Sequence, residues 1–205
     1  MFYDTKKNNH GMPVDPFKAL VAPRPIGWIS TVDAQGRVNL APFSFYNGVS
    51  EAPPMVMYCP GGSYGSAPAK HSLLNVQATG EFVVNVVSEE LKDAMNVTAG
   101  MVDVGIDEMK LAGLEPAASH MVKPPRVARA PAALECKLWK VIELPGNGPQ
   151  VPYAIVIGTV VGVYIDDKVV KEGRVDMLAF KPVGRLGYSE YTTVDNVWRM
   201  RRPNE

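Results

Sequence analysis

Short β-rich runs separated by turn residues are the feature of this sequence that most limits its fold. Such runs occupy residues 26–32, 38–41, 55–59 and 82–87, and two longer ones follow in the second half of the chain. Helices are predicted only as isolated insertions, over 72–79 and 89–99. This order predicts a mainly β protein, an antiparallel barrel or sandwich with short helices, and argues against a doubly wound parallel sheet.

The two longer runs form the clearest pair of strands. Apolar and charged residues alternate along the first of these runs, from Leu134 to Glu143. This alternation predicts a strand with a core face and a solvent face. The core face holds Leu134, Cys136, Leu138 and Ile142, and the solvent face holds Glu135, Lys137 and Glu143. Asn147-Gly148-Pro149 predicts the turn into a strand over 153–165. Ser88 is the predicted N-cap of the helix over 89–99, and Gly80 the stop of the helix before it.

The composition of the chain limits which partners it can bind and which cellular compartment it is expected in. Lys plus Arg equals Asp plus Glu at 21 each, so no net charge favours nucleic acid or an anionic membrane. Residues 1–15 are too polar for a signal peptide, and no apolar run is long enough to span a bilayer. Two distant cysteines, Cys59 and Cys136, are expected to be reduced. We expect a single cytoplasmic domain over 1–205 that binds neither nucleic acid nor membrane.

Several catalytic motifs are excluded by their context. The sequence Gly61-Gly62-Ser63-Tyr64-Gly65 satisfies GxSxG, but Pro68 lies where the helix of a nucleophile elbow should continue, so we interpret 61–69 as a loop. The three histidines lie far apart, which predicts no metal site. No GxGxxG and no P-loop is present, so neither a Rossmann fold nor an NTPase is supported.

Two less conspicuous segments offer binding chemistry. Lys70-His71-Ser72 opens a predicted helix, and free N–H groups, the helix dipole and a lysine together suit a phosphate. An ordinary capped helix would read the same. The segment Asn39-Leu-Ala-Pro-Phe-Ser-Phe-Tyr-Asn47 mixes aromatic with short polar residues, as the pocket of a planar heteroaromatic ligand does. The alternative for this segment is a core turn that packs Phe43 and Phe45.

Four blocks in order resemble the flavin reductase-like FMN-binding proteins. They read Arg24-Pro-Ile-Gly-Trp-Ile-Ser-Thr-Val-Asp33, Gly36-Arg-Val-Asn-Leu-Ala-Pro-Phe-Ser-Phe45, Glu81-Phe-Val-Val-Asn-Val-Val-Ser88 and Pro182-Val-Gly-Arg-Leu-Gly-Tyr188. Together they span about residues 20–203. The resemblance implies a Greek-key split barrel, usually a homodimer with FMN near the subunit interface, with 1–19 as an N-terminal extension and 183–205 closing the site.

The resemblance also implies which residues touch the cofactor. Those expected around the flavin are Trp28, Ser30, Thr31, Ser44, Phe45, Tyr46 and Asn47, with Lys70, His71 and Ser72 at its phosphate and Arg185 and Tyr188 closing the site. Many members of the family carry an acidic residue at the position of His71, so the phosphate contacts here depart from the common pattern.

The implied activity is that of an NAD(P)H:flavin reductase. Hydride would pass from NADH or NADPH to FMN, and no catalytic side chain or metal is expected, because the flavin carries the chemistry. The resemblance leaves two alternatives open: a flavoredoxin-like electron carrier and a non-catalytic flavin-binding module. A monooxygenase or an electron-transfer protein is a possible partner.

Overall fold

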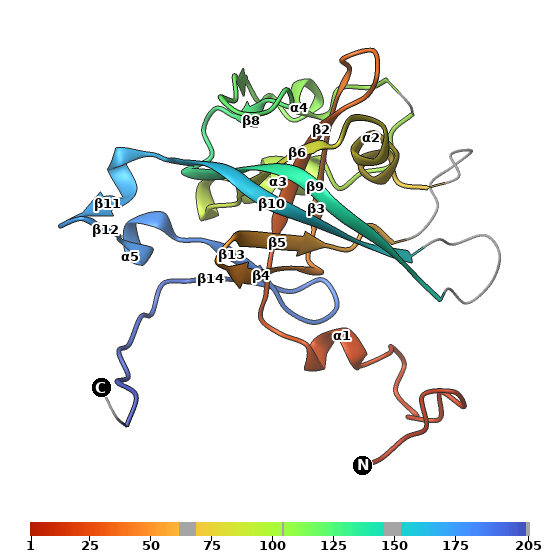
Figure 1. The fold of residues 1–205 in the computed structure, drawn as a ribbon. Coiled ribbons are helices and arrows are strands. Elements are labelled where there is room, and N and C mark those ends of the chain that lie inside the picture. Colours follow the sequence, from red (N-terminus) through yellow and green to blue (C-terminus); the bar gives the residue numbers. More distant parts are fainter. Residues whose placement is uncertain (62–68, 104, 146–152, 204–205) are drawn as a thin grey trace.

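The computed structural model describes residues 1–61, 69–103, 105–145 and 153–203. Within them, one antiparallel sheet of seven strands dominates (Figure 1). Its order is β3 (Val38–Phe43), β2 (Gly27–Val32), β6 (Glu81–Val86), β9 (Ala132–Leu144), β10 (Tyr153–Ile165), β5 (Pro54–Tyr58) and β4 (Tyr46–Glu51). The first and last strands of this order are consecutive in sequence and are joined at Ser44 and Phe45. We call this junction the seam of the sheet.

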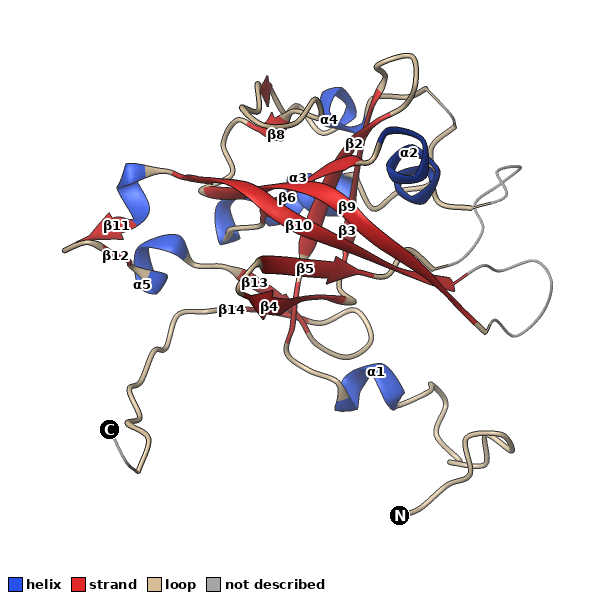
Figure 2. Ribbon diagram, viewed as in Figure 1, coloured by secondary structure: helices blue, strands red, loops and turns tan. Residues whose placement is uncertain are grey.

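Smaller elements surround this sheet (Figure 2). A second sheet contains β1 (Arg24–Pro25), β13 (Val183–Arg185) and β14 (Tyr191–Thr193), and two short pairs join β7 (Pro116–Ala117) to β8 (Arg126–Val127) and β11 (Val170–Lys171) to β12 (Arg174–Val175). The α-helices are α1 (Phe17–Leu20), α2 (His71–Thr79), α3 (Lys92–Val97), α4 (Glu108–Leu111) and α5 (Met177–Phe180), with 3-10 turns at Glu89–Leu91 and Asp167–Val169. The predicted mainly β architecture is confirmed.

Helix α2 matches its predicted range and ends at Gly80, whose φ of 73° is left-handed. The helix predicted over 89–99 is instead a 3-10 turn followed by α3, which ends at Val97. Ser88 lies at the N-cap position with extended backbone, but its side chain makes no capping hydrogen bond. The GxSxG serine, Ser63, and the predicted turn at 147–149 lie outside the described residues.

The face assignment along β9 needs correction at two places. The register with β10 shifts between Ile157 and Gly158, which pair with Lys140 and Leu138, so Trp139 is an extra residue on β9. Such a bulge reverses the alternation beyond it. As a result Val141 packs toward the core, whereas Ile142 is 37% exposed. Glu135, predicted on the solvent face, is buried.

Glu135 is buried because a loop covers its face of the sheet. Its carboxylate accepts hydrogen bonds from the N–H groups of His120 and Met121, at 2.9 and 2.5 Å. These bonds compensate the carboxylate for its lost hydration.

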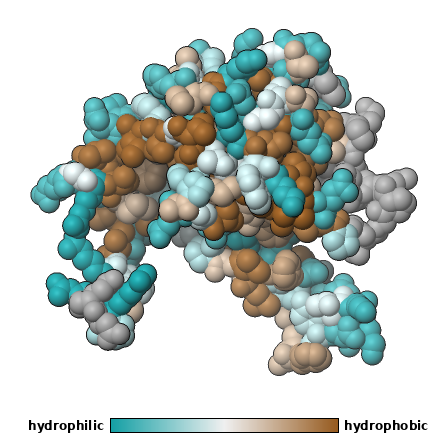
Figure 3. Space-filling model, in the orientation of Figure 1, coloured by the Kyte–Doolittle hydropathy of each residue, from teal (hydrophilic) through white to brown (hydrophobic). Residues whose placement is uncertain are grey.

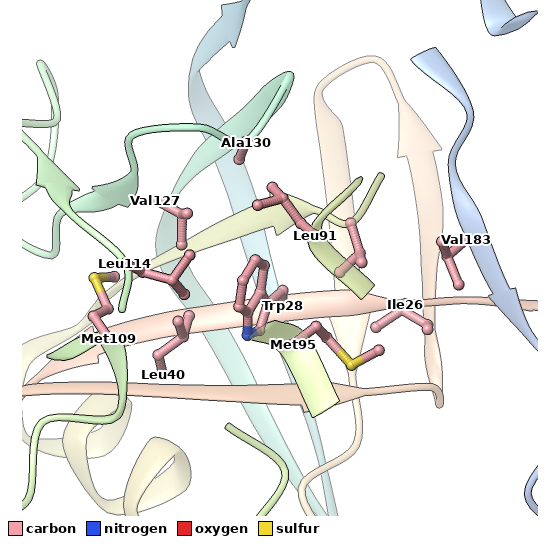
Figure 4. Packing of buried hydrophobic residues seen from close by; sticks show 11 residues of the cluster. Ile26, Trp28, Leu40, Leu91, Met95, Met109, Leu114, Val127, Ala130 and Val183 are labelled. Atoms are coloured by element: carbon pink, nitrogen blue, oxygen red, sulfur yellow. The ribbon is translucent and has the colours of Figure 1, made fainter. Parts of the chain in front are cut away.

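Two buried clusters fill the molecule. In one, Trp28 lies at the centre of apolar side chains from β2, β3, α3 and α4 (Figure 4). In the other, the interior of the seven-stranded sheet, Leu73 and Val76 of α2 pack with residues such as Tyr58 and Phe82. Since β2 is buried on both faces, its alternate residues enter different clusters.

Both chain ends extend away from this body (Figure 1). The face seen in Figure 3 carries apolar surface where β9 and β10 cross it, and exposed side chains of these strands include Trp139 and Val163, each 60% exposed. Within the described part of the chain, no helix is long and apolar enough to cross a membrane.

Candidate functional site

A cavity of about 90 Å³ lies beside edge strand β3. The first turn of α2 forms one wall and the segment that follows α3 forms another, while β3 supplies the floor. Its lining residues are Asn39, Ala41, Pro42, Phe43, Lys70, His71, Ser72, Thr98, Ala99, Gly100, Val102 and Glu108. Pockets that enclose whole organic ligands have about 300–1,000 Å³, so this cavity fits one small group, such as a phosphate.

The start of α2 provides hydrogen-bond donors to this cavity. Lys70 is the N-cap residue, yet no side chain caps the helix. The N–H groups of a first helical turn have no acceptor within the helix, and the helix dipole adds partial positive charge there. Ser72 is 1% exposed, and its Oγ has no hydrogen-bond partner among the described residues. A buried hydroxyl without a partner is unusual in a folded protein and fits a site that a polar ligand completes.

Charge around the cavity is mixed. Lys70 brings a cation, and burial lowers the pKa of its ammonium group. Glu108 is 4% exposed, its Oε2 accepts from the N–H of Leu40 at 3.0 Å, and burial raises the pKa of its carboxyl. A raised pKa favours the uncharged acid, which reduces repulsion of an anion. The arrangement therefore suits an anion held from the Lys70 side.

Two of the residues expected at the flavin instead position the walls of this cavity. Trp28 is fully buried, and its indole N–H donates to Thr98 Oγ1 at 2.8 Å. Thr31 is also fully buried, and its hydroxyl accepts from the amide of Asn75 on α2 at 3.0 Å. In this structure neither side chain is open to a ligand. Trp28 fixes the wall after α3, and Thr31 fixes α2.

The side chain of Ser30, another residue expected at the flavin, is enclosed by protein in this structure. It is fully buried on the face of β2 that it shares with Trp28, opposite Thr31, where its hydroxyl donates to the carbonyl of Pro125 at 2.6 Å and accepts from Asn85 at 3.3 Å. Because alternate residues of a strand point to opposite faces, Ser30 and Thr31 cannot both face one ligand. Ser30 belongs to the core network.

The expected residues at the seam lie just beyond the cavity, since Phe43 lines it and Ser44 follows. Ser44 and Phe45 are held by Arg24, which donates to Ser44 Oγ at 3.4 Å and lies 5.8 Å from the Phe45 ring centre. Tyr46 is half-buried, and burial raises its pKa to about 12. Asn47 is exposed and accepts from the N–H of Gly48. Phe43 is the last residue of β3, so these four residues continue the chain directly from the cavity lining.

Arg185 and Tyr188 do not line the cavity. Arg185 donates to the Tyr191 hydroxyl and to the carbonyl of Tyr188, and it lines a separate cleft against α3. Tyr188 is 49% exposed with a φ of 52°. The structure thus brings together the phosphate residues and the seam, but places the expected closing residues elsewhere in the chain's own fold.

Five lining residues lie outside every segment singled out in the sequence: Thr98, Ala99, Gly100, Val102 and Glu108. Asn39, by contrast, stands at the start of a segment singled out above. Thr98 and Gly100 follow α3, and only the tertiary fold brings them to α2. Among the described residues, no group of three or more His, Cys, Asp or Glu side chains is placed to hold a metal.

Comparison with known proteins gives a family match over most of the chain. The model of the flavin reductase-like domain matches residues 20–187. An uncharacterised protein of Aquifex aeolicus is 37% identical over 173 residues, covering 84% of this chain and 85% of its own.

Solved structures match over nearly the whole length. Nitrilotriacetate monooxygenase component B of Bacillus cereus gives a TM-score of 0.86 at 28% identity, with 98% of each chain covered. The 2-nitrobenzoate 2-nitroreductase NbaA of Pseudomonas fluorescens gives 0.85 at 27%, covering 99% of this chain and 96% of its own.

A putative flavin reductase with a split barrel domain from Shewanella frigidimarina gives a TM-score of 0.83 at 25% identity, with 98% and 99% coverage. Flavoredoxin of Desulfovibrio vulgaris shares the fold at 19% identity, with a TM-score of 0.76 and 98% and 97% coverage. The fold is a split barrel, and the chain belongs to the flavin reductase-like family.

Proposed function

We propose that this protein binds FMN with the phosphate in the cavity beside α2. The observation that carries the proposal is the Ser72 hydroxyl, buried without a partner at an uncapped helix start next to Lys70. A phosphate would accept from the Ser72 hydroxyl, from the lysine and from the N–H groups of His71 and Ser72. These two N–H groups donate to no group among the described residues, whereas the next N–H, that of Leu73, already donates to the carbonyl of Lys70. His71, also in the lining, offers a further donor.

The isoalloxazine ring would lie along the seam. The cavity is too small for a whole flavin, and β3 leads from it to Ser44, Phe45, Tyr46 and Asn47. Arg24 contacts the first two of these residues, through a hydrogen bond to Ser44 and a cation–π contact with Phe45. Main-chain N–H groups between Ser44 and Tyr46 are candidates to stabilise negative charge on a reduced ring.

The activity we propose is reduction of this flavin by NADH or NADPH. Bound FMN supplies a hydride acceptor, so the chain needs only to bind, orient and shield it. No side-chain nucleophile or base is therefore required among these residues. Membership of the family and the likeness to a putative flavin reductase and a monooxygenase component B support this activity.

Anaerobic spectroscopy tests this function. Purified protein is titrated with FMN, and NADH or NADPH is then added while the flavin absorbance is followed. We expect saturable FMN binding and rapid bleaching by at least one of the two nucleotides. Failure to bind FMN would contradict the whole proposal. Binding without bleaching by either nucleotide would reject the reductase; reduction by a protein donor would then identify a flavoredoxin-like carrier, and no reduction at all a non-catalytic flavin-binding module.

We also propose a cytoplasmic homodimer built from one domain per chain. The apolar side chains exposed on β9 and β10, including Trp139 and Val163, favour a second copy as the surface that covers them. The ring at the seam would then be partly shielded by that copy. Light scattering of purified protein checks this, with twice the chain mass of 22.3 kDa as the expected result and the monomer mass as the contradicting one.

A further inference from the structure

A second cleft lies between α3 and the sheet of β13 and β14. It encloses about 530 Å³, within the range of pockets that hold small organic molecules. It shares no lining residue with the cavity beside α2. Its polar lining includes two cations and several hydroxyls, with one carboxylate: Lys92, Arg185, Ser189, Thr192, Thr193 and Asp93.

Arg185 is held rigidly in this cleft. Its guanidinium lies 4.3 Å from the centre of the Tyr191 ring and donates both to the hydroxyl of that residue and to the carbonyl of Tyr188. These contacts employ two of the five N–H donors of an arginine. The remaining donors of Arg185 have no partner among the residues that the structure describes, and their planar arrangement is the geometry that binds a carboxylate or phosphate through two hydrogen bonds.

Positive charge exceeds negative charge at this place, because the cleft lining holds Lys92 and Arg185 against the single carboxylate of Asp93. Among the described residues, Arg24 nearby donates only to the backbone carbonyls of three residues and to the Ser44 hydroxyl. Arg24 and Arg185 stand directly opposite each other on β1 and β13, and like charges in such cross-strand pairs are destabilising. Burial, and then the charge of Arg185, lower the pKa of Arg24. In the part of the chain that the structure describes, Arg24, Arg185 and Lys92 form no ion pair with a carboxylate. A bound anion would offset this excess.

From these observations we infer that the cleft binds a small organic anion, whose carboxylate or phosphate contacts Arg185 and Lys92. The neighbouring hydroxyls of Ser189, Thr192 and Thr193 would hydrogen-bond the rest of the molecule. Both binding places flank α3, whose six residues span about 9 Å. The inference does not require FMN, because the cleft and the cavity have separate walls.

Titration calorimetry with two probes tests the site. Adenosine 2′,5′-bisphosphate represents phosphate ligands and benzoate represents carboxylates, each added to flavin-free protein and again with FMN present. At least one probe should bind. Arg185→Gln should weaken its binding about 10- to 100-fold, as expected for a charge-assisted hydrogen-bond pair, and Lys92→Ala about threefold. Lys171→Ala, an exposed cation on β11, is the matched control and should bind as the wild type does.

The outcomes distinguish a failure of the cleft site from a failure of the proposed function. The probe that binds tighter identifies the anion class, and loss of FMN binding with retained probe binding would reject the proposed function alone. If neither probe binds the wild-type protein, or if both cleft variants bind it undiminished, the site does not exist. Should Arg185→Gln fail to fold, Lys92→Glu replaces it, since reversing a charge beside the anion should lower affinity at least tenfold.

Discussion

Two buried polar side chains of this molecule, Asn85 and Ser72, differ in their hydrogen-bond partners. Asn85 is fully buried between β2 and β8, and its amide donates to the carbonyl of Trp28 and to Ser30 while accepting from the N–H of Val127 at 2.7 Å. Ser72 is as deeply buried, yet its hydroxyl has no partner in the described structure.

The difference separates polar groups that maintain the fold from one that awaits a ligand. An unpaired buried polar group costs about 1–3 kcal/mol, so a protein retains one where function requires it. Three hydrogen bonds offset the cost of burying the Asn85 amide. The cost of burying the Ser72 hydroxyl is offset only if a ligand in the neighbouring cavity bonds to it. The two places should therefore respond to mutation in opposite ways, one through stability and the other through flavin affinity.

The largest effect is expected at the satisfied site. Asn85→Ala removes all three bonds and leaves the Val127 N–H without its acceptor, so the free energy of unfolding should fall by about 3 kcal/mol. Urea denaturation measures this loss. Molecules that remain folded should bind FMN within about twofold of the wild type. A stability change below about 1 kcal/mol would show that the network contributes little.

At the cavity, Lys70→Ala should raise the dissociation constant for FMN about 10- to 100-fold, because a charge-assisted bond to the phosphate is lost. Urea denaturation of the flavin-free variant separates an effect on folding from one on affinity, since Lys70 is half-buried at a helix start. In protein saturated with flavin, stopped-flow reduction by nicotinamide should stay near the wild-type rate. Unchanged FMN affinity would remove Lys70 from the site.

Ser72→Ala and Ser30→Ala form a matched pair of hydroxyl deletions. Ser72→Ala should weaken FMN binding about fivefold and leave the stability of the flavin-free protein unchanged or slightly higher, since no bond is lost. Ser30→Ala should lower stability by about 1 kcal/mol and leave affinity unchanged. Flavin titration and urea denaturation of both variants measure these effects. A loss of stability in Ser72→Ala together with a loss of FMN affinity in Ser30→Ala would contradict the comparison.

The smallest effect concerns Glu108. Burial raises its pKa in the folded protein, so its contribution to stability is complete below the ordinary value of about 4.3 and declines as pH rises through the raised folded value. Glu108→Gln should abolish that decline and modestly strengthen FMN binding at pH 8, because a carboxylate beside the phosphate is gone. Urea denaturation between pH 4 and 8 measures the decline in stability, and flavin titration at pH 8 measures the affinity. The substitution Glu143→Gln, at an exposed glutamate, is the control. Identical pH profiles would contradict this role.

The fold was largely predictable because alternation and turn residues are local signals. Most strands and α2 follow from them, and ordered blocks of sequence pointed to the family. The bulge at Trp139 was not predictable, since one inserted residue changes pairing without changing the alternating pattern before it. The burial of Glu135 was missed because it depends on a distant loop at His120.

The candidate site was predictable only where its residues are close together in sequence. Lys70, His71 and Ser72 are consecutive and open a helix, so their cluster could be recognised locally. Trp28 and Ser30 lie in the right sequence block, but β2 is buried on both faces, so both side chains point into the protein interior. Thr98 and Glu108 reach the cavity only through tertiary packing.

The most direct test of the phosphate cavity compares FMN with riboflavin, which has the same ring and no phosphate. Dissociation constants of both are measured for the wild type, Lys70→Ala and Ser72→Ala. We predict that the wild type binds FMN at least tenfold tighter than riboflavin, and that this preference falls about 10- to 100-fold in Lys70→Ala and about fivefold in Ser72→Ala while riboflavin binding stays constant. Equal affinity of the wild-type protein for the two flavins would contradict an anion site at the start of α2.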